Sequence, residues 1–81
     1  MSIEHDEQPV SAAGQAIDLL GGPSAVVRLL EKRGISISPW AVNKWRRRVP
    51  PERVLLLEEL TEGRITRHEL RPDIYPMEQT A

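Results

Sequence analysis

The sequence predicts an all-α fold made of a run of short helices. Apolar residues recur three or four positions apart in several stretches, the spacing that places them on one face of a helix. Glycine or proline separates these stretches, and serine or threonine stands at the start of several, where its side chain can cap a helix. The alternating segment Ile35-Ser36-Ile37 is too short for a stable strand and has no visible partner strand.

Length and composition indicate one small domain. The 81 residues are near the lower limit at which one apolar core holds a fold unaided, so a deep enzymatic cleft is not expected. The absence of cysteine excludes disulfides, thiolate zinc sites and iron–sulfur clusters. The acidic N-terminal segment has no apolar run typical of a secretory signal, and no stretch approaches membrane-spanning length. We therefore expect a cytoplasmic protein that does not contact a membrane.

The first two predicted helices are bounded by residues that start or stop a helix. Ser11 caps the first helix and Gly21-Gly22 ends it, whereas Pro23 opens the second helix and Gly34 ends it. Between these boundaries, the apolar residues expected to face the core are Ala13, Ala16, Ile17, Leu20, Ala25, Val26, Leu29 and Leu30.

The third helix is predicted to span residues 39–48 and to have an apolar inner face and a polar outer face. Ser38 is a suitable N-cap and Pro39 suits the first helical position, where a missing N–H costs nothing. Val42 and Trp45 share the inner face, and the residues on or near the outer face are Trp40, Asn43, Lys44 and Arg47. Val49-Pro50-Pro51 then ends the helix.

Two further helices complete the predicted domain. The fourth covers residues 52–61, brings Val54, Leu56, Leu57 and Leu60 to the core, and ends at Gly63. The last is a short turn at 67–70 in which Thr66 and Glu69 form a capping box. These boundaries divide the chain into a disordered acidic arm at 1–10, a helix-turn-helix domain at 11–71 and a tail at 72–81.

The charge distribution favours an anionic partner, although the formal net charge is −1. Residues 24–53 hold eight basic and two acidic residues, a net charge of +6, whereas the remaining residues sum to −7. A basic centre between acidic ends is typical of a surface that binds phosphate. Arginines can also serve only to solvate a helix, but here they coincide with the third helix, which favours binding in the major groove of DNA.

The side-chain chemistry of the third helix suggests separate roles in DNA binding. Asn43 can pair with adenine through its carboxamide, and Lys44 suits guanine acceptors or a phosphate. Arg47 reaches either the groove floor or the backbone, and Trp45 is expected to be core. The residues expected to bind phosphate are Ser38, Arg46, Arg48 and Arg53.

Several motifs occur in an order that is typical of a known family. They are Gly21-Gly22, Gly34, the segment from Ser38 to Trp45, Val49-Pro50-Pro51-Glu52-Arg53 and the segment from Ile65 to Asp73. Over roughly residues 12–76 the chain resembles the Cro-like, YdaS-type phage helix-turn-helix regulators. The resemblance implies a five-helix bundle of the lambda-repressor-like (Cro/XRE) type that binds double-stranded operator DNA, generally as a homodimer, and represses transcription. Several members of that family are antitoxins beside a partner toxin.

Two positions depart from the family pattern, in which glutamine is frequent. Pro23 cannot offer an amide side chain to a phosphate, but the backbone N–H groups there and the Ser24 hydroxyl can bind one. Trp40 offers one donor and a large apolar face, so the base preference must differ. Either Trp40 packs on a thymine methyl group or the sugar-phosphate wall, or it covers the turn between helices.

Nothing in the sequence favours catalysis, a cofactor or a metal. His5 and His68 are far apart and lack the spacing of paired metal ligands. Gly21-Gly22-Pro23-Ser24 lacks the lysine of a nucleotide-binding loop, and Glu58 and Glu59 splay apart as neighbours in a helix. We therefore expect that this protein is not an enzyme.

Two functions from different classes remain. The first is a sequence-specific, nucleoid-associated DNA-binding repressor. The second is an antitoxin-like module that binds a partner toxin, with DNA binding vestigial. The second is motivated by Ile74, Tyr75 and Met77, apolar residues expected to lie outside the bundle, because exposed apolar clusters often mark partner sites.

Overall fold

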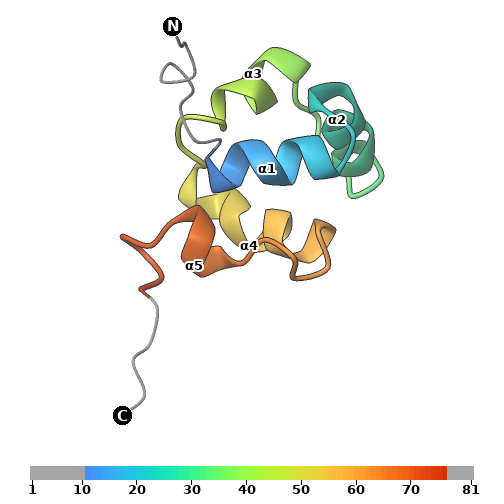
Figure 1. Ribbon diagram of the computed structural model, residues 1–81. Helices are drawn as coiled ribbons and strands as arrows, with labels where there is room; N and C mark the ends of the chain where they lie inside the picture. Colours follow the sequence, from blue (N-terminus) through green and yellow to red (C-terminus); the bar gives the residue numbers. More distant parts are fainter. Residues whose placement is uncertain (1–10, 77–81) are drawn as a thin grey trace, which may run out of the picture.

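The computed structural model describes residues 11–76 and is all-helical in this range, with five helices and no strand. The helices are α1 (Ala12–Leu19), α2 (Pro23–Glu31), α3 (Pro39–Lys44), α4 (Pro51–Leu60) and α5 (Arg67–Leu70). α1 lies in the middle of the bundle, with α3 on one side and α4 on the other (Figure 1). The arm predicted at 1–10 and Met77 lie outside the described residues. In the described range, no helix is long and apolar enough to cross a bilayer.

Three helices, α1, α3 and α5, start at the capping residues that the sequence predicts. Ser11 Oγ accepts a hydrogen bond from the Gly14 N–H at 3.0 Å, and Ser38 Oγ accepts one from the Ala41 N–H at 3.1 Å. Thr66 and Glu69 form the expected capping box at the start of α5. These contacts satisfy backbone donors that have no partner within the helix.

The core consists of the inner faces of all five helices and the segments that join them. Its fully buried side chains include Ile17 from α1, Leu30 from α2, Val42 from α3 and Leu57 from α4. Most predicted core positions are buried, but Leu20, Ala25, Leu29, Leu56 and Leu60 are partly exposed. Of these, Leu20, Leu56 and Leu60 pack against the edge of the core. The apolar periodicity therefore predicts the inner faces correctly but overestimates their width.

α3 ends at Lys44 and does not reach Arg48, so the predicted span of 39–48 is wrong at its C-terminal end. The three residues after Lys44 form a tight turn in which each N–H bonds to the carbonyl three residues earlier. This turn brings Val49 into the core, where it is fully buried, and Ser11 Oγ donates to the Arg46 carbonyl at 2.8 Å. Burial of Val49 and the start of α4 at Pro51 require the chain to leave the helical path early.

The segment after α5 is packed against the domain, whereas the sequence assigns residues 72–81 to a tail. Arg71 is buried; its Nη1 donates to the Val49 carbonyl at 2.7 Å, and its Nε and Nη2 donate to Asp73 at 2.9 and 2.7 Å. Tyr75 packs against the core, and its carbonyl lies 3.0 Å from Nδ1 of His68. The expectation that Tyr75 lies outside the bundle is therefore wrong.

We predict that the Arg71–Asp73 pair makes stability depend on pH in the acid range. The hydrogen bond from Arg71 lowers the pKa of Asp73 from 3.8 to about 2. Because the folded state holds this carboxylate ionised, the pair stabilises the protein above pH 3.8, and the stabilisation is lost as the pH falls to about 2. Asp73→Asn should lower the melting temperature at pH 7, and its difference from the wild type should shrink across this window. A difference that does not change between pH 7 and pH 2 would contradict the prediction.

Candidate nucleic-acid interface

α3 is fixed to the bundle by its inner face and exposes its outer face. Val42 is fully buried and Trp45 is 4% exposed, and α3 packs against α2. On the outer face, Asn43 and Lys44 are exposed and the Trp40 side chain is 70% exposed. The structure thus separates the two tryptophans as the sequence indicates, one in the core and one in solvent.

The side chains of Trp40 and Lys44 contact each other on the outer face of α3. The Lys44 ammonium lies 4.2 Å from the centre of the Trp40 ring, a cation–π contact between residues four apart in α3. Trp40 remains largely exposed despite this contact. The contact does not distinguish the two roles considered for Trp40, but it holds the Lys44 ammonium over the indole.

The residues predicted to read bases lie along one open groove. Trp40, Asn43, Lys44 and Arg47 line it together with Arg46, and its volume is about 430 Å³. Arg47 follows α3 in the tight turn and is exposed. Although Arg47 is not on the helix, the structure brings all four predicted base readers to the same surface.

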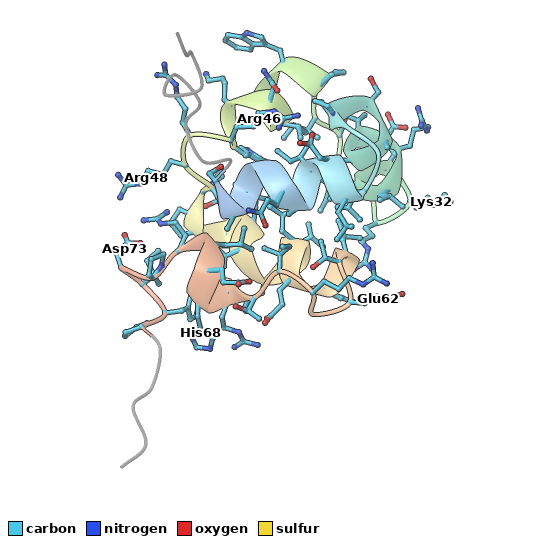
Figure 2. All side chains as sticks on the ribbon, in the orientation of Figure 1. Lys32, Arg46, Arg48, Glu62, His68 and Asp73 are labelled. Atoms are coloured by element: carbon cyan, nitrogen blue, oxygen red, sulfur yellow. The ribbon has the colours of Figure 1, made fainter. Side chains whose placement is uncertain are left out.

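Arg46, which is predicted to bind phosphate, makes hydrogen bonds to two other side chains of the protein. Its Nη2 contacts Oδ1 of Asp18 at 2.9 Å, and its Nε donates to Oδ1 of Asn43 at 2.7 Å. The side chain of Arg46 is 33% exposed, and Figure 2 shows it between α3 and α1. Sequence reasoning missed Asp18, because nothing in the local pattern links α1 to a residue 28 positions later.

The other residues expected to bind phosphate are spread around α3. Ser24 is exposed in the first turn of α2, and Ser38 is exposed but uses its oxygen to cap α3. Arg48 is exposed and lies 3.6 Å from Asp73, on the same side of the molecule in Figure 2. Arg53 is partly exposed in the first turn of α4.

Comparison with known proteins places the chain in a family. A family model described as "Bacterial toxin YdaS" matches residues 13–79. The chain belongs to the YdaS family. A relative named "Putative transcriptional regulator YdaS", from Escherichia coli (strain K12), is 43% identical over 63 residues, which is 74% of this chain. The match spans 59% of the length of that relative. No solved structure matches this YdaS-family chain.

We predict that the two tryptophans differ sharply in their effect on stability. Trp45→Ala should reduce the free energy of unfolding by about 3–5 kcal/mol, because it leaves a cavity under α3. Trp40→Ala is the matched control and should cost less than about 1 kcal/mol, since it removes an exposed indole and one cation–π contact. Urea denaturation followed by circular dichroism measures both variants, and equal losses would contradict the assignment of inner and outer faces.

Proposed function

We propose that this YdaS-family chain is a sequence-specific, double-stranded DNA-binding transcriptional regulator that acts as a Cro-like repressor. In this proposal α2 and α3 form a helix-turn-helix of the Cro/XRE type, and α3 enters the major groove. The observation that carries it is the two-sided character of α3, with Val42 and Trp45 buried beneath an exposed polar face. The name of the E. coli relative agrees with a regulatory role.

The charges around α3 support a nucleic-acid partner. No acidic residue occurs between Lys32 and Pro51, so the sequence around α3 is wholly basic or neutral. Arg47 lines the groove and is exposed. Arg48, the next residue, is also exposed and pairs with Asp73 through a long contact in solvent. A phosphate group can replace such a weak, exposed pair at little cost.

The proposal includes a homodimer on DNA. Two copies of α3 would enter successive major grooves about 34 Å apart, which requires an operator with two-fold symmetry. Repression would follow if such an operator overlaps a promoter. An inverted repeat upstream of a neighbouring gene is therefore the first sequence to test as a binding site.

A second candidate function is binding of a partner protein in a toxin–antitoxin pair. The description of the family model contains the word toxin, and Ile74 is 39% exposed within the C-terminal segment that follows α5. Growth of cells after induced expression of the chain and its variants distinguishes this function from DNA binding. Growth inhibition that persists in Arg47→Ala but is lost in Ile74→Asp would favour a protein partner, whereas loss in Arg47→Ala alone would favour DNA.

We predict that Arg48→Ala weakens DNA binding through the loss of one phosphate contact. Affinity should fall to a similar degree for all DNA sequences, and the slope of log K against log salt should become less steep by about one. Arg64→Ala is the matched control, because Arg64 is an exposed arginine in the turn after α4, outside the basic segment at 24–53. Fluorescence anisotropy with an operator duplex at several salt concentrations gives both slopes.

Two results would reject parts of this proposal. Wild-type binding that does not depend on salt would reject phosphate recognition altogether. Identical slopes for Arg48→Ala and Arg64→Ala would remove Arg48 from the interface.

A further inference from the structure

The side-chain amide of Asn43 has a fixed orientation. Its Oδ1 accepts a hydrogen bond from Nε of Arg46 at 2.7 Å. An arginine Nε–H can only donate, so the atom that faces it must be the amide oxygen and not the amide nitrogen. The Nδ2 group, with its two N–H donors, is therefore the part of the carboxamide left for a ligand.

α1 holds Arg46 in the position that this contact requires. Asp18 Oδ1 contacts Nη2 of Arg46 at 2.9 Å, and Ser11 Oγ donates to the Arg46 carbonyl at 2.8 Å. Ser11 and Asp18 are about two helical turns apart and so lie on one face of α1. Arg46 is therefore supported at its backbone and at its guanidinium, with Asn43 on α3 as the third contact.

We infer that Arg46 is a positioning residue that makes Asn43 a donor-only reader, so that the base facing Asn43 is guanine and not adenine. This inference rests on the proposed DNA-binding function and assigns the base class that the groove recognises. An unrestrained asparagine favours adenine, because its oxygen accepts from N6 while its nitrogen donates to N7. With the oxygen held by Arg46, the two Nδ2 hydrogens match the O6 and N7 acceptors of guanine.

A second lone pair on the Asn43 oxygen does not restore the preference for adenine. An adenine N6–H donor that approaches this oxygen would be placed beside the guanidinium cation of Arg46. Both donors would then converge on the same oxygen, and the positive charge of the guanidinium would repel the partly positive N6 hydrogen. The acceptors of guanine meet no such repulsion.

The neighbouring side chains in the groove have the same donor-only character. Lys44 and Arg47 carry N–H donors without an acceptor, and the Trp40 indole adds one further N–H donor. None of the residues that line the groove is acidic. Guanine presents two acceptors in the major groove, whereas cytosine presents a donor, so the whole surface fits guanine-bearing half-sites.

The test is selection of binding sites from a random duplex library by the full chain and its variants. The position facing Asn43 is identified as the one whose base preference disappears in Asn43→Ala. The wild type should prefer guanine over adenine there by about tenfold in a competition assay. Arg46→Ala should shift that preference toward adenine without changing the preference at other positions.

Two further variants distinguish a role of Arg46 in positioning Asn43 from the simple loss of a phosphate contact. Asp18→Ala removes the support from α1 while keeping Arg46, and it should shift the base preference in the same direction but less. Arg48→Ala is the control for a lost phosphate contact, and it should lower affinity while leaving the selected motif unchanged. Circular dichroism of each variant shows whether it is folded.

The outcomes are distinguishable. A wild-type chain that selects no sequence overturns the proposed function and the inference with it. A wild-type motif with adenine at the Asn43 position, or an Arg46→Ala variant that loses affinity equally for all bases, overturns the inference and leaves the DNA-binding function standing.

Discussion

The orientation of α3 depends on burial of the apolar side chains beneath and after it. Val42 and Trp45 fix the inner face of the helix, and Val49 fixes the chain where it turns back toward α4. Together they determine which side chains of this six-residue helix face solvent. So short a helix is not stable alone, and its conformation is maintained by tertiary packing and by the Ser38 cap.

The acidic residues outside the basic segment are not confined to the ends of the molecule. Among residues 11–76, three of the basic residues between positions 24 and 53 pair with carboxylates outside that segment: Arg33 with Glu59, Arg46 with Asp18 and Arg48 with Asp73. The positive electrostatic potential at the groove is therefore weaker than the net charge of residues 24–53 indicates. Within the described residues, Lys44 and Arg47 make no ion pair, and they contribute most directly to an attraction for phosphate or base acceptors.

Arg71 connects the C-terminal segment to the loop that follows α3. It is buried, and it donates to the Val49 carbonyl as well as to Asp73, which in turn contacts Arg48. The carbonyl of Val49 would otherwise be a buried acceptor, and leaving such an acceptor without a partner costs about 1–3 kcal/mol. The segment after α5 therefore helps to define the surface near α3 although it is distant in the sequence.

Local patterns in the sequence were sufficient to predict the helical class, the capping residues and the inner faces. Ser11, Ser38 and Thr66 act within one turn of their own positions, and the apolar spacing of Val42 and Trp45 needs only the period of a helix. The family was also evident from motifs such as Val49-Pro50-Pro51-Glu52-Arg53 and is confirmed by the comparisons.

Local sequence patterns could not predict the contacts between segments that are distant in the sequence. The early end of α3, the packing of Tyr75 and the engagement of Arg46 by Asp18 and Asn43 all depend on which segments meet in space. A periodic pattern shows which face of a helix is apolar, but it does not show which carboxylate lies opposite a given arginine. The orientation of the Asn43 carboxamide follows from that pairing, because its oxygen accepts from the guanidinium and its two N–H donors point away from that contact.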